Sequence, residues 1–145
     1  MKIAIGADHA GYRLKEHLIA HGLSQHQVLD VGTHSEESTD YPIYAFRVAR
    51  LVASGEADLG VLICGTGIGM AMAASRVAGI RAALCTTEYM ARMARAHNDA
   101  NVLCLGGRVL GPDQALAILQ AFLATQFEGG RHARRVRMIE EGSGE

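Results

Sequence analysis

The residues best suited to chemistry stand in the hexapeptide Cys64–Gly69, which reads Cys-Gly-Thr-Gly-Ile-Gly. It follows the apolar run Leu59–Ile63 directly, so Cys64 is expected at the end of a buried strand. Glycine at every second position lets backbone N–H groups turn toward one point without Cβ clashes, which makes an anion-binding loop. The next segment, Met70–Arg76, is rich in helix formers and would add the positive end of a helix dipole. We therefore expect a lowered pKa at Cys64, and a base or nucleophile beside an anion-binding loop.

The residues of this loop argue against three familiar kinds of anion-binding loop. Gly65, Gly67 and Gly69 form G-x-G-x-G, and Met70 stands where the dinucleotide-binding G-x-G-x-x-G motif needs its last glycine. No Gly-Lys-Ser/Thr ending supports a P-loop, and Met70 also occupies the place of the arginine that a cysteine phosphatase needs. Free cysteines are commonly buried structural thiols, so position alone leaves a structural and a chemical role for Cys64 both open.

Two polar pairs lie at the ends of other predicted strands. Asp8 and His9 follow the first strand, where they could bind hydroxyls or a phosphate, or cap a helix. His97 and Asn98 precede the last strand. A histidine that enters the same edge of the sheet could be a general acid near neutral pH, although a turn alone would explain Asn98.

Three arginines are candidates for binding a phosphate. Arg131 and Arg135 are four residues apart, so on a helix they share one face and could hold one phosphate, or form a solvated basic face. Arg108 comes just after the last predicted strand, near the expected crevice or an interface.

Five short apolar runs alternate with segments of helical periodicity. This alternation predicts an α/β fold, a Rossmann-like three-layer αβα sandwich around a five-stranded parallel sheet. The strands are expected at Lys2–Gly6, Gln27–Val31, Leu59–Ile63, Arg81–Cys85 and Asn101–Leu105. The helices are expected near Gly11–His21, Tyr41–Ser54, Ile68–Val77, Glu88–Ala96 and Pro112–Thr125, with a last one from about Arg131.

Right-handed crossovers leave few orders for five parallel strands, and we expect the flavodoxin-like order 2-1-3-4-5. In that order the winding reverses between strands 1 and 3, and ligands bind beyond their carboxyl ends. Asp8 and His9 follow strand 1, and Cys64–Gly69 follows strand 3. The two loops are therefore expected to meet in one crevice.

Composition narrows the class of protein. We expect one domain over residues 1–145, with fraying only in Glu141–Glu145. The formal net charge of −1 argues against general affinity for nucleic acid or anionic membranes, and no apolar stretch approaches transmembrane length. We expect no secretory signal, because the polar Asp8 comes too soon. The three cysteines form no C-x-x-C pair, which argues against a disulfide framework or a zinc site. This use of cysteine favours a cytoplasmic protein. We expect Cys85 and Cys104 in the core.

Seven motifs follow one another in a recognisable order: Ile5–His9, Asp30–Thr33, Thr39–Pro42, Ile63–Gly69, Ala78–Arg81, His97–Asn101 and Glu128–His132. Together they resemble the ribose-5-phosphate isomerase B family, within a wider group that includes galactose-6-phosphate isomerases. The similarity extends from Lys2 to about Met138. It implies interconversion of ribose 5-phosphate and ribulose 5-phosphate in pentose phosphate metabolism, without a metal or an organic cofactor. It also implies a homodimer or homotetramer whose active sites are shared between subunits.

The resemblance further implies roles for individual residues. Cys64 would be the general base that moves a proton between C2 and C1. A branch of the family uses a glutamate slightly later in the loop, where Met70 stands here, so the cysteine mechanism is implied. His97 would assist opening of the sugar ring. Thr66 and the amides of Gly65, Gly67, Ile68 and Gly69 would bind the enediolate oxygen. Asp8 and Asn98 would bind hydroxyl groups of the sugar. The phosphate would be bound by His9, Arg108, Arg131 and Arg135.

Other functions stay open at this point. The nearest is the same chemistry on a six-carbon substrate, allose 6-phosphate or galactose 6-phosphate. A non-catalytic sugar-phosphate-binding module would explain the loop and the arginines, but it gives no reason for Cys64 and His97. A thiol hydrolase is the third alternative.

Overall fold

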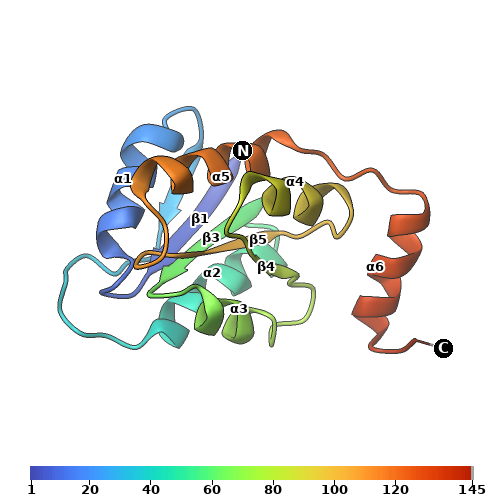
Figure 1. The fold of residues 1–145 in the computed structure, drawn as a ribbon. Helices are drawn as coiled ribbons and strands as arrows, with labels where there is room; N and C mark the ends of the chain where they lie inside the picture. Colours follow the sequence, from blue (N-terminus) through green and yellow to red (C-terminus); the bar gives the residue numbers. More distant parts are fainter. Residues whose placement is uncertain (145) are drawn as a thin grey trace.

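A computed structural model describes residues 1–144 and has five parallel strands in one sheet, with helices on both of its faces (Figure 1). This confirms the expected fold class. The strands are β1 (Lys2–Ala7), β2 (Gln27–Asp30), β3 (Leu59–Cys64), β4 (Ala82–Leu84) and β5 (Val102–Gly106). The helices are α1 (Tyr12–Gly22), α2 (Tyr41–Ala53), α3 (Ile68–Ala74), α4 (Glu88–Ala96), α5 (Pro112–Ala124) and α6 (Arg131–Glu141).

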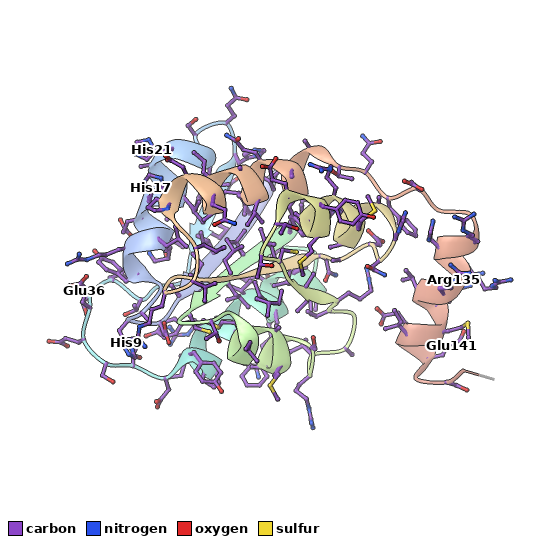
Figure 2. All side chains as sticks on the ribbon, viewed as in Figure 1. His9, His17, His21, Glu36, Arg135 and Glu141 are labelled. Atoms are coloured by element: carbon purple, nitrogen blue, oxygen red, sulfur yellow. The ribbon has the colours of Figure 1, made fainter. Side chains whose placement is uncertain are left out.

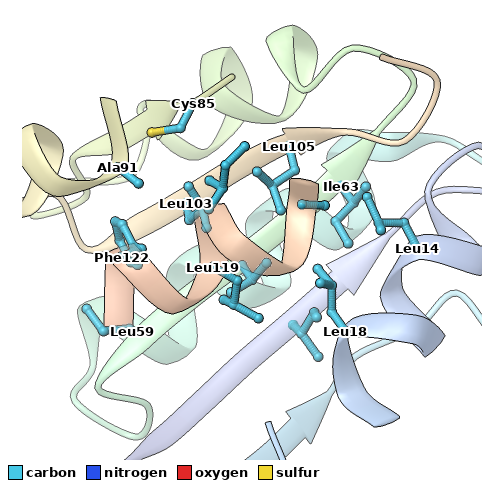
Figure 3. Packing of buried hydrophobic residues seen from close by; sticks show 14 of the residues in the cluster. Leu14, Leu18, Leu59, Ile63, Cys85, Ala91, Leu103, Leu105, Leu119 and Phe122 are labelled. Carbon is cyan, nitrogen blue, oxygen red and sulfur yellow. The ribbon is translucent and has the colours of Figure 1, made fainter. Parts of the chain in front are cut away.

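The sheet separates two apolar cores, because side chains alternate between the faces of a strand. Ile63 of β3 points into the core beneath α1, α4 and α5, where Leu119 and Phe122 are fully buried (Figure 3). Leu62 and Cys64 point to the opposite face, into the core beneath α2 and α3. The alternation thus directs the Cys64 thiol toward the α2–α3 layer.

The predicted strand order is wrong in its last two strands. The sheet runs β2-β1-β3-β5-β4, so β5 lies beside β3 and β4 forms the edge. Burial explains the exchange: every residue of β5 is buried, whereas the three residues of β4 are only partly buried. A short, half-buried strand is better suited to an edge, where it pairs on one side only. The reversal of winding between β1 and β3 is as expected.

The last helix, α6, stands apart from the sandwich, beyond α4 (Figure 1). Its base is held where the amide of Glu128 donates to the carbonyl of Ala96, 3.0 Å away. Farther along, Glu140 of α6 forms an ion pair with Arg81. The expected fraying of the tail is a prediction, and its final residue lies outside the described part of the chain. None of the helices in residues 1–144 combines the length and the apolarity needed to cross a bilayer.

Candidate active site

The carboxyl ends of β1 and β3 bring Asp8 and Cys64 to one place. The amide of Asp8 donates to the carbonyl of Ile63 at 3.2 Å, and both Asp8 and Cys64 are almost fully buried. Asp8 Oδ1 accepts hydrogen bonds from the amides of Ala10 and Gly11 at 3.0 and 3.1 Å. One carboxylate oxygen therefore fixes the turn into α1, which leaves Oδ2 as the acceptor that can face a ligand.

The glycine loop turns its own amides toward polar side-chain atoms. The amide of Gly67 donates to Cys64 Sγ at 3.2 Å, and that of Ile68 donates to Thr66 Oγ1 at 3.2 Å. Gly67 has φ +82°, a left-handed conformation that glycine adopts without strain. Two of the amides expected in the anion hole are therefore already engaged inside the loop. Within residues 1–144, the amides of Gly65, Thr66 and Gly69 have no hydrogen-bond partner.

This loop lines an open cleft of about 420 Å³. We call it the thiol cleft; its lining residues are Asp8, Tyr41, Cys64, Gly65, Thr66, Ile68, Gly69 and Met72. Sequence reasoning gave no role to Tyr41 or Met72. Tyr41 packs so closely on Gly69 that a Cβ there would lie 2.5 Å from the ring, and Met72 is 70% exposed at the rim. The fixed spacing of the Thr39–Pro42 motif is the one sequence signal that pointed to Tyr41.

Arg108 reaches the thiol cleft because β5, not β4, lies next to β3. Cys64 pairs with Gly106 in the sheet, and the amide of Arg108 donates to the carbonyl of Gly65 at 3.0 Å. The Arg108 side chain lies over Gly65, with Cδ and Nη1 both 3.6 Å from the position a Cβ would take. A guanidinium at this point can bind an anion in the cleft.

The tautomer of His9 is set by a backbone contact. Its Nδ1 accepts a hydrogen bond from the amide of Thr39 at 3.1 Å, so the neutral ring carries its proton on Nε2. Thr39 is itself held by a 2.9 Å contact between Oγ1 and the Tyr44 hydroxyl. His9 can therefore donate one N–H to a phosphate or hydroxyl oxygen.

The other predicted site residues lie at the opposite edge of the sheet, so the expectation that His97 enters the same edge as Cys64 is wrong. His97 caps the C-terminus of α4, and Asn101 bonds to Arg81 before β4 begins. A five-residue strand thus separates this edge from the Cys64 edge, roughly 16 Å at about 3.3 Å per residue. We call His97, Asn98, Arg131 and Arg135 the amino-edge group. Figure 2 shows His9 and Arg135 on opposite sides of the molecule.

The remaining cysteines are structural, as predicted. Cys104 is fully buried and Cys85 is 1% exposed. Burial raises the pKa of Cys85 to about 11 and raises the pKa of Cys104 further. Neither thiol is therefore suited to act as a base near neutral pH.

One cluster in residues 1–144 has the residue types of a metal site. Side-chain atoms of His97, Glu128 and His132 lie within 4.8 Å of one another. The two imidazoles are stacked in nearly parallel planes, 8° apart. Because ring lone pairs lie in the ring plane, parallel rings cannot both point at one ion. This geometry suits hydrogen bonding around the carboxylate better than metal binding.

Comparison with known proteins decides the family. The family described as Ribose/Galactose Isomerase matches residues 3–139. The chain belongs to the ribose/galactose isomerase family. It is 52% identical to Escherichia coli ribose-5-phosphate isomerase B, over 95% of this chain and 93% of that protein. A ribose-5-phosphate isomerase B structure from Clostridium thermocellum superposes with a TM-score of 0.95 at 55% identity, covering 97% of this chain and 96% of the other. The type B enzyme of Trypanosoma brucei gives a TM-score of 0.94 at 49% identity, over 98% of each chain.

Proposed function

We propose that residues 1–145 form one isomerase domain that interconverts ribose 5-phosphate and ribulose 5-phosphate through an enediolate, with Cys64 as the general base. The observation that carries the proposal is the thiol at the bottom of the thiol cleft. Its Sγ accepts a hydrogen bond from the amide of Gly67, and the same cleft is lined by Gly65, Thr66 and Gly69, whose amides have no partner within residues 1–144. The names of the Escherichia coli and Clostridium thermocellum relatives support the choice of substrate.

The chemistry follows from these positions. The Cys64 thiolate removes the proton at C2, and the electron pair of that bond forms the C1–C2 double bond while the aldehyde oxygen becomes an enediolate oxygen. The N–H bond from Gly67 stabilises negative charge on sulfur, and the free amides of the loop can stabilise the charge on oxygen. The Cys64 thiol then returns the proton to C1, and the proton of the C2 hydroxyl passes to the C1 oxygen, so that C2 becomes the ketone and C1 carries the hydroxyl. A phosphate bound by arginines holds the sugar while its other end reacts.

A second copy of the chain would complete this site. The amino-edge group cannot reach Cys64 within one chain, yet its histidine and arginines suit ring opening and phosphate binding. The thiol cleft has an exposed apolar rim, in which Ile68 is 52% and Met72 is 70% exposed. These observations favour a homo-oligomer in which the thiol cleft of one subunit faces the amino-edge group of its partner. The need for a free thiol favours a reducing compartment, in keeping with the cytoplasm.

The substitution Cys64→Ala tests the base. We expect the turnover of ribose 5-phosphate to fall about 1000-fold, because general bases contribute roughly 100- to 10,000-fold. Exchange of the substrate C2 proton with deuterated solvent, followed by NMR, should stop as well. Cys85→Ala is the matched control, because it removes a buried thiol outside the cleft and should keep both activities. Retained exchange in folded Cys64→Ala protein would refute the assignment.

The substrate and the class of function are tested by the same assays. We expect kcat/KM for ribose 5-phosphate to exceed that for allose 6-phosphate, and the reverse order would assign a six-carbon substrate. Thermal stabilisation by sugar phosphates without any turnover would indicate a binding module. A covalent adduct on Cys64, seen by mass spectrometry, would indicate a thiol hydrolase.

A further inference from the structure

Two residues outside the predicted site surround His97. The ring of His132, on α6, stacks on the ring of His97 with centroids 4.1 Å apart. Glu128, which precedes α6, places Oε1 3.9 Å from His97 Nε2 and 3.7 Å from His132 Nε2. Both imidazoles therefore approach the same carboxylate oxygen.

Backbone bonds hold this arrangement in place. The amide of Glu128 donates to the carbonyl of Ala96, the residue before His97, at 3.0 Å. The amide of His132 donates to the carbonyl of Gly129 at 3.1 Å. The backbone of Glu128 is thus tied to the end of α4, and the turn that follows it leads directly into the start of α6.

Charging both rings of the histidine pair, His97 and His132, is unfavourable. Two imidazolium ions with centroids 4.1 Å apart would repel each other strongly, while a single cation is attracted by the carboxylate of Glu128. Interacting groups of this kind titrate in two separate steps.

The surroundings of the two rings differ. The His132 side chain is 10% exposed, and burial, His97 and the neighbouring Arg131 and Arg135 lower the pKa of His132 more than Glu128 raises it. The His97 side chain is 39% exposed, so its charged form keeps more hydration. On the α4 side, Asp99 is paired with Arg81 and Arg95, and Glu88 is paired with Arg92.

We propose that Glu128 and His132 are positioning residues: His132 stays neutral because of its burial and its basic neighbours, and the single proton of the histidine pair resides on His97. The carboxylate stabilises the cation on His97, and the neutral His132 ring holds the His97 ring in its orientation by stacking. The benefit to ring opening rests on the proposed function, since His97 must be protonated to donate a proton to the ring oxygen of the sugar. The assignment of the proton does not depend on it.

The test is an NMR titration of the histidines in the full-length, substrate-free protein, over roughly pH 5 to 9. In the unsubstituted protein, His97 should become protonated at a higher pH than His132. In Glu128→Gln, the acid dissociation constant of His97 should rise about threefold or more, because the imidazolium loses a nearby carboxylate. Glu141→Gln is the control: it removes one negative charge from the far end of α6 (Figure 2) and should leave His97 unchanged. Protonation of His132 before His97, or a Glu128→Gln protein with an unaltered His97 titration, would overturn the proposal.

A second variant, His132→Phe, keeps a flat ring for stacking but cannot bind a proton. If His132 is neutral while His97 titrates, His97 should keep its acid dissociation constant within about twofold. A large change would mean that the two rings share the proton, which contradicts the proposal. Kinetics separate the proton assignment from the role of His97 in ring opening. If both hold, the alkaline limb of the pH profile of kcat/KM for ribose 5-phosphate should move to lower pH in Glu128→Gln. If the NMR titration shifts but this limb does not, the role of His97 in the proposed function fails and the proton assignment is upheld.

Discussion

At the scale of single residues, the candidate site divides its work between charge stabilisation and proton transfer. Cys64 is almost buried but borders an open cleft, and its sulfur accepts an N–H bond from Gly67. His9 offers one N–H because the Thr39 amide occupies its other nitrogen. His97 lies at the other edge of the sheet with a carboxylate and a second imidazole beside it. Each side chain has a local partner that favours one protonation state or orientation.

A prediction at this scale separates the roles proposed for His97 and Cys64. Ribose 5-phosphate is mostly a closed ring, whereas ribulose 5-phosphate is open-chain, so only reactions that start from the aldose need ring opening. We expect His97→Ala to lower aldose turnover about 100-fold or more, since general acids contribute effects of this size. Exchange of the ketose C1 proton with deuterated solvent should persist, because it requires only the enediolate. Loss of both activities together would show that His97 acts in the proton shuttle itself.

At the scale of secondary-structure elements, the loop between β3 and α3 depends on a close approach between backbone and neighbours. Gly67 has φ +82°, and a Cβ there would lie 2.6 Å from Leu84 Cδ1 and 3.0 Å from the carbonyl oxygen of Leu105. Neither the backbone conformation nor the space admits a side chain. The loop keeps its shape because β4 and β5 close in on it from the side.

The substitutions Gly67→Ala and Gly79→Ala together measure how much the close neighbours of Gly67 add to the cost of a side chain. Both glycines have φ above +80°, but a Cβ at Gly79 would meet no atom within 4 Å. Gly79→Ala should therefore cost about 1 kcal/mol of unfolding free energy from backbone strain alone. Gly67→Ala should cost about 2–4 kcal/mol, because displaced neighbours add to the strain. Urea unfolding checks both values, and equal costs would mean that the neighbours yield freely. Where Gly67→Ala remains folded, its turnover should fall while that of Gly79→Ala is kept.

At the scale of the whole molecule, one chain carries two half-sites at opposite edges of its sheet. The thiol cleft is lined by Asp8 and Cys64, with Arg108 over its Gly65, and the amino-edge group includes His97 and the arginines of α6. The helix that carries these arginines stands away from the sandwich, with His132 as its buried residue. A two-fold assembly that brings one half-site against the other would generate two complete sites at once.

Mixing of inactive subunits tests this arrangement. Hybrids of a Cys64→Ala subunit with a His97→Ala subunit contain one complete site and one doubly substituted site. Random exchange between two such dimers should restore about one quarter of the unsubstituted activity, because half of the dimers are hybrids and each has one working site of two. Mass spectrometry under native conditions would confirm that hybrids have formed. Hybrids without activity would indicate that each site is built from one chain.

The sequence by itself determined the parts of this protein that depend on local pattern. Apolar periodicity and turn residues are read along a short stretch, so the five strands, the six helices and the placement of Cys64 at a strand end were predictable. The placement of Asp8 beside Cys64 needed only the reversal of winding between strands 1 and 3. The resemblance of seven motifs added the reaction, which spacing alone left open.

Only the tertiary structure decided the order of the last two strands. The choice between β4 and β5 beside β3 depends on how much apolar surface each strand can bury on both faces, and that is a property of the whole packed sheet. This choice places Arg108 over Gly65. His97 lies at the far edge for a different reason: it precedes β5, and the strands are parallel. The stacking of His97 on His132 likewise joins residues 35 positions apart through the docking of α6. Long-range packing, which no local pattern encodes, therefore determines the neighbours of each half of the candidate site.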